Sequence, residues 1–360
     1  MTKTLADRLT FRGMELKNRI CVGPMGNATS TGADGVVNDK MIEHFRAVAQ
    51  GGAALIIQGA ASVTDENKAH LTQTGVWSDE HVNGLSRITQ TVHAENCKII
   101  LQLEHAGMRA LAKEPFSPSP YVMRAWGKEK TCHVMTIDEI HAVQKLYADA
   151  AKRAVLAGYD GVELHASHGW MISDFLSPCI NRREDEYGRD KLLFVREIFQ
   201  MVREAVPNDF VIGIRLAAYN PDLATGLEQA RQVEEMGFDY INVSNNPVVA
   251  WLPQEMTKPE NYPFSAHTYS TVEMRKAVQL PLLGGKEIRT AEEAEAILLE
   301  TDADMILLGR GFLADPRWAG KVLAGEEPVL CQHCPGRCPW QLGGENCAAR
   351  ALARSGTHEI

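Results

Sequence analysis

Residues 161–168 read GVELHASH, a short apolar run that ends in one histidine and is followed by a second. A run of this length and character is typical of a strand buried on both faces, as parallel strands are. Comparable runs occur at 21–25 (CVGPM), 54–59 (ALIIQG), 99–103 (IILQL), 211–216 (VIGIRL), 240–244 (YINVS), 280–284 (LPLLG) and 305–309 (MILLG). The sequence therefore predicts eight buried strands.

Helical segments separate these strands. In 138–157, apolar residues recur at three- and four-residue steps behind Thr136 and Asp138 as cap candidates, and 290–300 (TAEEAEAILLE) begins with Thr290 and acidic residues. Repeated strand–helix units also fit a doubly wound sheet, but eight of them favour closure. We expect a (β/α)8 TIM barrel over 1–325 and a short C-terminal Cys-rich segment, 326–360, packed on it.

Composition limits the partners. The chain has 360 residues, 45% apolar and 23% charged, and a net charge of −9 without a basic block. Nothing here favours nucleic acid or an anionic membrane. No apolar run approaches the roughly 18 residues of a membrane helix, and the first residues lack a signal-peptide core. We expect a cytoplasmic protein with a small-molecule substrate, and homo-oligomerisation stays open.

Two proline-rich stretches, 107–135 and 245–269, interrupt the strand–helix alternation. Both follow the carboxyl end of a strand, where barrel enzymes build their sites. We expect substrate-facing loops, the alternative being ordinary surface excursions.

Polar residues stand in or after otherwise apolar strands: Gln58, Gln102, His165, Arg215 and Asn242. A buried arginine is costly unless it meets a charge or a ligand. Alone, Arg215 fits a structural ion pair. Together with Gln102 and His165 it forms a convergent set that suits a planar heterocycle.

The seventh and eighth strands end in glycine-rich turns. These are Gly284-Gly285-Lys286 and Gly309-Arg310-Gly311. Loops at these two positions are the recurrent phosphate site of barrels, where glycines let backbone amides approach an anion. The pattern predicts a phosphorylated cofactor.

His165 and His168 can reach one point if the backbone turns between them, either to bind a metal or to donate two hydrogen bonds to an oxygen. The absence of a nearby third ligand weighs against zinc. The alternative is that one histidine is a cap or a core hydrogen-bonding group.

Four cysteines gather near the C-terminus: Cys331, Cys334, Cys338 and Cys347. In a reducing compartment such a cluster indicates metal rather than disulfides. Four thiolates suit either a [4Fe–4S] cluster or tetrahedral zinc.

Four motifs together resemble the Old Yellow Enzyme family of FMN oxidoreductases, from about residue 5 to residue 350. They are VGPMGNATS, LQLEHAG, HASHGWMISDFLSPCINRREDEYG and ADMILLGRGFLADPRW. The resemblance implies bound FMN, with Pro24, Met25, Gly26 and Gly59 or Ala60 near its reactive edge. It also implies that Gln102 and Arg215 bind the pyrimidine side, that Gly284, Gly285, Gly309 and Arg310 surround the phosphate, and that His165 and His168 bind a substrate oxygen.

The chain departs from the family at Trp170, where many members carry a proton-donating tyrosine. Indole cannot supply a proton at useful cost. The stretch 249–252 (VAWL) also lacks the histidine that assists in the dienoyl-CoA reductase branch. Water, His267, Tyr269 or Cys179 remain as donors, and cation–π binding of an amine by tryptophan remains an alternative.

The Cys segment resembles the iron–sulfur branch of the family, with 2,4-dienoyl-CoA reductase and trimethylamine dehydrogenase, and favours [4Fe–4S] over zinc. No GxGxxG motif follows it. Electrons would therefore come from NAD(P)H at the flavin, from a carrier, or from a separate electron-donor protein or subunit.

We thus expect reduction of an activated C=C bond by hydride from flavin. The alternatives are an amine or N-methyl dehydrogenase and an electron-transfer flavin subunit of a larger complex.

Overall fold

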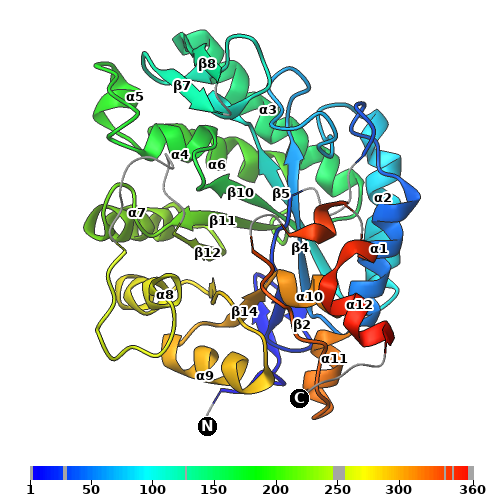
Figure 1. Ribbon diagram of the computed structural model, residues 1–360. Helices are drawn as coiled ribbons and strands as arrows, with labels where there is room; N and C mark the ends of the chain where they lie inside the picture. The colour runs from blue at the N-terminus through cyan, green and yellow to red at the C-terminus, as the bar shows by residue number, and fades with distance from the viewer. Residues whose placement is uncertain are drawn as a thin grey trace.

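A computed structural model of the protein describes residues 3–26, 31–125, 128–245, 256–335, 338–342 and 344–355. In these residues eight parallel strands close a barrel in the order β10-β11-β12-β13-β14-β3-β4-β5. Their bounds are β3 (Ile20–Val22), β4 (Leu55–Ser62), β5 (Lys98–Glu104), β10 (Gly161–Ala166), β11 (Val211–Ala217), β12 (Tyr240–Ser244), β13 (Leu282–Gly284) and β14 (Met305–Leu308). Each predicted strand is present, and the (β/α)8 prediction is confirmed (Figure 1).

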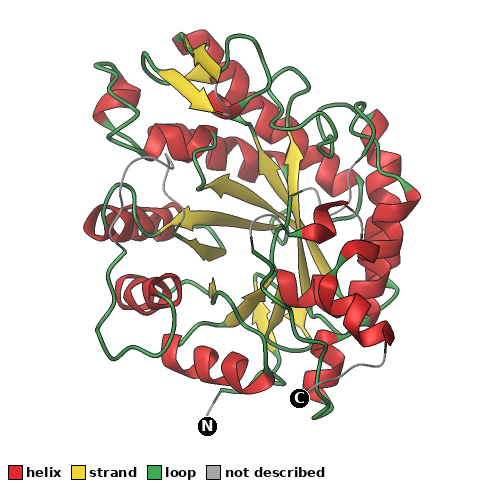
Figure 2. Ribbon diagram, in the orientation of Figure 1, coloured by secondary structure: helices red, strands yellow, loops and turns green. Residues whose placement is uncertain are grey.

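Helices surround the strands, as Figure 2 shows. The longer ones are α1 (Asp39–Gln50), α2 (Glu80–His93), α3 (Ile137–Leu156), α6 (Leu193–Ala205), α7 (Leu223–Met236), α8 (Ala266–Ala277) and α9 (Ala291–Thr301). Thr136 and Thr290 cap α3 and α9, each in a reciprocal capping box with the glutamate three residues on. Both helix starts therefore follow from the local sequence.

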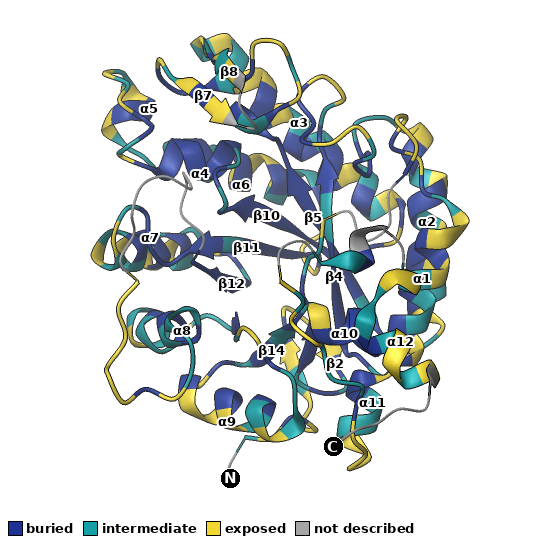
Figure 3. Ribbon diagram, viewed as in Figure 1, coloured by how far each residue is buried: buried dark blue, intermediate teal, exposed yellow. Residues whose placement is uncertain are grey.

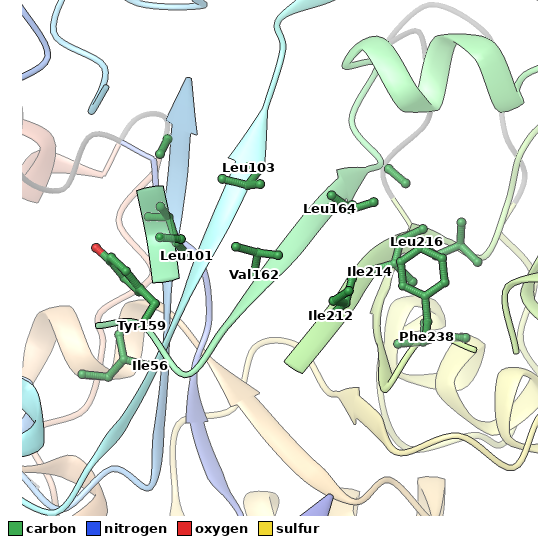
Figure 4. Close-up of a cluster of buried hydrophobic side chains, with 14 of the residues drawn as sticks. Ile56, Leu101, Leu103, Tyr159, Val162, Leu164, Ile212, Ile214, Leu216 and Phe238 are labelled. Atoms are coloured by element: carbon green, nitrogen blue, oxygen red, sulfur yellow. The ribbon is translucent and has the colours of Figure 1, made fainter. Parts of the chain in front are cut away.

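Strand periodicity divides the apolar residues between two cores. Outward-facing side chains such as Leu101, Val162 and Ile214 pack under the helices in one large cluster, part of which Figure 4 shows. Inward-facing ones such as Ile57, Ile100 and Val211 fill the barrel. In Figure 3 the buried residues of the barrel strands and of the inner faces of the helices are dark blue.

A hairpin closes the amino-terminal end of the barrel. Its strands β1 (Leu9–Phe11) and β2 (Met14–Leu16) are antiparallel, and Phe11 lies 5.7 Å from Tyr240, ring centroid to ring centroid. Phe11, Met14 and Leu16 belong to the same apolar cluster as the barrel interior. With this end filled, the open space for a ligand is at the carboxyl ends of the strands.

The stretch 107–135 is more ordered than the loop we predicted. It contains the short 3-10 helix η1 (Gly107–Arg109), an antiparallel hairpin of β7 (Val122–Ala125) and β8 (Lys128–Thr131), and a parallel pair of β6 (Phe116–Ser117) and β9 (His133–Val134). Pro115 and Pro118 flank β6, at the strand ends that proline tolerates. In the other stretch, 246–255 lie outside the described residues, and α8 already begins at Ala266.

The C-terminal segment folds back over the barrel. After α10 (Arg310–Ala314) and α11 (Trp318–Leu323) it forms short 3-10 turns and α12 (Ala348–Ser355). Arg350 donates to the Leu313 carbonyl at 2.7 Å, and the Trp340 ring lies edge-on to His44 of α1, 5.1 Å away (Figure 1). Within the described part of the chain, no helix is both long and apolar enough to cross a membrane.

Candidate active site

A cavity of about 310 Å³ opens at the carboxyl ends of the barrel strands. Six of the eight barrel strands contribute residues to its wall, from their carboxyl ends or from the turns that follow. His333 of the Cys segment also contributes. The lining residues are Gly23, Pro24, Met25, His168, Arg215, Ser244, Asn245, Met256, His267, Gly285, Lys286, Glu287, Ile288, Leu307, Leu308, Gly309, Arg310, Gly311 and His333.

One end of the cavity has the character of a phosphate site. Gly285 has a φ of +102°, a backbone conformation that residues with a side chain rarely adopt. A Cβ there would lie 2.9 Å from the side chain of Ile288. Gly309 and the cations Lys286 and Arg310 lie in the same wall. Gly284 does not line it: a Cβ there would lie 2.5 Å from Thr271 of α8, so this glycine serves the close approach of helix and strand.

The carboxyl ends of the first two barrel strands, β3 and β4, form another side of the site. Pro24 and Met25 line the cavity. Gly59 and Ala60 lie behind them, in an adjoining recess that Met25 also lines. A Cβ at Gly59 would lie 2.6 Å from Cβ of Pro24, so glycine permits the contact of the two strand ends. Gly26 is exposed and lies outside the lining set.

Arg215 enters the cavity floor from β11, and its buried Nε has no hydrogen-bond partner in the described part of the chain. Below it lies Glu163, which accepts hydrogen bonds from Gln102 at 2.6 Å, Tyr240 at 2.9 Å and Asn242 at 3.0 Å. Burial raises the pKa of Glu163, and the charge of Arg215 opposes this most strongly. Gln102 is thus committed to Glu163 and does not itself line the cavity.

The two histidines meet side by side. His168 has a φ of +65°, and the turn it makes brings its Nδ1 to 2.9 Å from Nε2 of His165. His168 Nε2 lies 3.0 Å from Oγ of Ser244, while His165 Nδ1 lies 2.9 Å from Oε2 of Glu104. Burial lowers the pKa of both histidines well below the usual value, and Arg215 adds to this, so both are neutral near pH 7.

Glu104 and Glu163 are site residues that we did not predict. Each is a carboxylate at an alternate position of an apolar strand, and both are buried. That signal was readable, since a charged residue is rarely fully buried unless it is paired. Gln58, by contrast, faces the helices, where its Oε1 accepts from Tyr159 at 2.7 Å.

Trp170 lies beside the histidines rather than over the cavity. Its ring centroid is 6.0 Å from that of His165, and its buried Nε1 meets no hydrogen-bond partner among the described residues. The guanidinium carbon of Arg109 lies 5.5 Å from the indole centroid. The face of the Trp170 ring that could bind an amine by cation–π attraction is therefore already occupied by Arg109.

All four predicted cysteines line a second cavity, of about 200 Å³, which also includes Arg310. Arg310 thus contributes to both cavities, and His333, between two of the cysteines, reaches the first. Among the described residues no three His, Cys, Asp or Glu side chains converge tightly enough to hold a single metal ion.

The larger cavity fits FMN on the chemistry of its wall. Three buried polar atoms there have no hydrogen-bond partner among the residues that the structure describes: Arg215 Nε, Asn245 Oδ1 and His267 Nδ1. A flavin ring offers both donors and acceptors, and the cations beside the glycine turns suit its phosphate. Lys286 and Arg310 are the candidates for that contact.

Comparisons with known proteins agree with this interpretation. Residues 5–327 match the NADH:flavin oxidoreductase / NADH oxidase family. The chain is 36% identical to a metal reductase from Desulforamulus reducens, over 90% of this chain and 49% of that protein, and so spans about half of it. It is 32% identical to an NADPH dehydrogenase from Bacillus pumilus, over 85% of this chain and 90% of that protein.

The fold is also that of a solved 2-naphthoyl-CoA reductase in complex with 2-naphthoyl-CoA. The TM-score is 0.82 at 21% identity, over 92% of this chain and 55% of the other. With the family match covering most of the barrel, the chain belongs to the NADH:flavin oxidoreductase / NADH oxidase family of oxidoreductases.

Proposed function

We propose that this barrel binds FMN and reduces an activated C=C bond, of enone or enoyl type, with NAD(P)H as the source of reducing equivalents. The observation that carries the proposal is the placement of His168 in one cavity with Arg215, Gly285 and Arg310. A substrate oxygen and a phosphorylated heterocycle can therefore be held in the same cavity.

Each end of the cavity has a separate task in this proposal. Lys286, Gly285, Gly309 and Arg310 would hold the phosphate, and Arg215 would face the heterocycle with its unpartnered Nε. FMN, when bound, would supply the hydride. His168 would bind the carbonyl oxygen of the substrate and polarise the conjugated bond, because a donor aimed at a developing negative charge lowers the barrier. His165, whose two ring nitrogens lie 2.9 Å from Glu104 and from His168, would orient His168 from behind.

The experiment is anaerobic reduction of the purified holoprotein by NADPH or NADH, followed by addition of cyclohex-2-enone. We expect the flavin absorbance to bleach and then return, with cyclohexanone as product. Failure of the enone to restore the absorbance would refute C=C reduction, even if the protein binds FMN. We do not propose amine oxidation, since Arg109 already faces the Trp170 ring.

We further propose that residues 326–360 form a distinct redox segment and that its four cysteines bind a [4Fe–4S] cluster. Zinc would hold four thiolates only about 3.8 Å from one another, given Zn–S bonds of about 2.3 Å. A cluster holds its thiolates farther apart, around four irons and four sulfides. That all four cysteines line one cavity supports the proposal that they bind a single group together.

The shared wall residue Arg310 supports an electron path between the two cavities. Through such a path a separate electron-donor protein or subunit can serve as an alternative to NAD(P)H. The chain would then act within a larger complex, and reduction of the flavin by dithionite-reduced ferredoxin, but not by NAD(P)H, would favour this second role.

A further inference from the structure

The proposed reaction needs a proton as well as a hydride, and three of the side chains considered from the sequence are poor sources of one. Trp170 has no dissociable proton of use. Burial, with Lys286 and Arg215, lowers the pKa of His267 to about 3, so it is neutral. The hydroxyl of Tyr269 interacts with Glu273, and this contact raises its pKa.

A continuous chain of hydrogen bonds instead leads from the cavity to a buried carboxyl group. It runs from Ser244 to His168 at 3.0 Å, to His165 at 2.9 Å and to Glu104 at 2.9 Å. Glu104 and His165 are 3% and 5% exposed, so the inner end of the chain is closed to solvent.

Gln73 fixes which oxygen of Glu104 can carry a proton. Its Oε1 accepts from the backbone N–H of Ala69 at 2.8 Å, so its Nε2 is the atom that donates to Oε1 of Glu104, also at 2.8 Å. Oε1 of Glu104 is thereby an acceptor. Oε2, which faces His165, is the oxygen left to hold a proton.

The charge of Glu104 then decides the direction of every bond in the chain, because each neutral imidazole has one donor and one acceptor nitrogen. With Glu104 ionised, His165 must donate from Nδ1, His168 must donate from Nδ1, and Nε2 of His168 is an acceptor. With Glu104 protonated, both imidazoles reverse, and Nε2 of His168 becomes a donor. A carbonyl oxygen in the cavity can accept a hydrogen bond from Nε2 of His168 only in the second arrangement, in which Glu104 is protonated.

We propose that Glu104 is the proton reservoir of the active site and the switch of its oxygen-binding group: its proton sets both histidines to donate toward the cavity and passes through them to the substrate. This inference rests on the proposed function for the identity of the substrate, but the switch itself is a property of the chain.

The transfer balances without any further reactant. One proton moves from Oε2 of Glu104 to Nδ1 of His165, one from Nε2 of His165 to Nδ1 of His168, and one from Nε2 of His168 to the reduced substrate. The O–H bond of Glu104 breaks, and an O–H bond forms on the enolate oxygen that hydride addition leaves, with a lone pair of that oxygen. The enol then becomes the saturated ketone, because water gives a proton to its α-carbon and takes one from its oxygen. After the product leaves, water in the cavity returns a proton to Nε2 of His168, and the same transfers in reverse restore the proton on Glu104 before the next turnover.

Burial supports this role, since it raises the pKa of Glu104 to about 7, against the hydrogen bond of Gln73 and the charges of His70 and Arg109. The titratable or charged groups around Glu104 are His70, Arg109, Tyr147, Asp174 and His165. A carboxyl group poised near the working pH is well suited to general acid catalysis.

Glu104→Gln separates the two tasks. The amide can still accept from Gln73 and donate to His165, so it imitates the protonated carboxyl group but has no proton to give. In the FMN-loaded variant we expect cyclohexanone, an unreactive oxygen acceptor, to bind with wild-type affinity at pH 6. We expect reoxidation of the reduced flavin by cyclohex-2-enone to slow by about 100-fold, the usual contribution of a general acid.

The pH dependence provides the second readout. In the wild type, cyclohexanone binding should weaken about tenfold per pH unit above pH 7, while in Glu104→Gln it should not change with pH. Glu197→Gln is the matched control, because Glu197, like Glu104, accepts a hydrogen bond from a glutamine side chain, at 2.6 Å from Gln144, but does not line the cavity. It should behave as the wild type in both assays.

Nitrogen NMR of histidine-labelled protein tests the switch without any turnover. We expect the proton of His168 to move from Nε2 to Nδ1 as the pH rises through about 7 in the wild type, and to stay on Nε2 in Glu104→Gln. A His168 tautomer that ignores pH in the wild type, or an undiminished enone rate in Glu104→Gln, would overturn the proposal. Loss of enone reduction in the wild type with the NMR switch intact would instead refute only the proposed substrate class.

Discussion

Oε2 of Glu104 lies 2.9 Å from Nδ1 of His165, and both side chains are buried at the carboxyl ends of neighbouring strands. The pKa of Glu104 is raised in the folded protein, to about 7, so the folded state holds a proton that the unfolded chain has lost at the same pH. Stability from this group is therefore present in acid and lost as the pH rises toward 7 and above.

This linkage predicts that the wild type loses about 2 to 3 kcal/mol of unfolding free energy from Glu104 alone between pH 5 and pH 8. Glu104→Gln should lack this component. Urea unfolding of both proteins at the two pH values measures it, and parallel changes in both proteins would show that Glu104 titrates normally.

The barrel could be predicted from the sequence because strand length and apolar character are local properties. The strand 240–244 was placed residue for residue, and both threonine caps are present with their glutamate partners. The order within 107–135 was missed, because strands of two to four residues carry too little periodicity to be recognised.

The candidate site was predicted only in part from the sequence. His168, Arg215, Gly285 and Arg310 meet in one cavity as the strand ends implied. Glu104 and Glu163 were missed because their roles depend on which neighbours the barrel register places beside them, and that register is a long-range property.

Removal of Arg215 should affect both stability and FMN. Arg215→Ala removes the buried cation whose charge most strongly favours ionised Glu163, so we expect the variant to be less stable than the wild type. The double variant Arg215→Met with Glu163→Gln should recover stability but bind FMN at least about tenfold more weakly than the wild type, since one charge-assisted hydrogen bond is worth about 1.5 to 3 kcal/mol. Thermal unfolding and FMN fluorescence titration separate the two effects, and full FMN affinity in the double variant would remove Arg215 from the flavin site.

Gly285→Ala should weaken FMN binding through the phosphate end of the cavity. The matched control is Gly325→Ala, because Gly325 also has a positive φ, +73°, but lies outside the cavity, and a Cβ added there would meet no atom within 4 Å. Both variants should lose about 1 to 2 kcal/mol of stability from backbone strain. Only Gly285→Ala should also lose FMN affinity; equal affinities would place the phosphate elsewhere.

Cys331→Ser should release the iron that we propose for the Cys segment. We expect about four irons per chain in anaerobically purified wild type, following the composition of the cluster, and a large loss in the variant. Cys179→Ser is the control, since Cys179 lies outside the cysteine-lined cavity, and should keep its iron. One zinc per chain in the wild type would contradict the cluster.

Trp170→Tyr should rescue the Glu104→Gln variant. Trp170 lies 6.0 Å from His165, centroid to centroid, so a tyrosine hydroxyl there would place a new proton donor beside the histidine pair. We expect the enone-dependent rate of the double variant to exceed that of Glu104→Gln by about tenfold, within the range of a positioned general acid. No rise would mean that this position does not reach the substrate.

The central claim is that the barrel is a flavin site for reduction of a C=C bond. The most direct measurement is an anaerobic stopped-flow trace of the FMN-loaded chain, reduced by one equivalent of NADPH and then mixed with cyclohex-2-enone. We expect the flavin absorbance to return and one cyclohexanone to form for each NADPH consumed. A flavin that stays reduced in the presence of the enone, or no flavin bound at all, would contradict it.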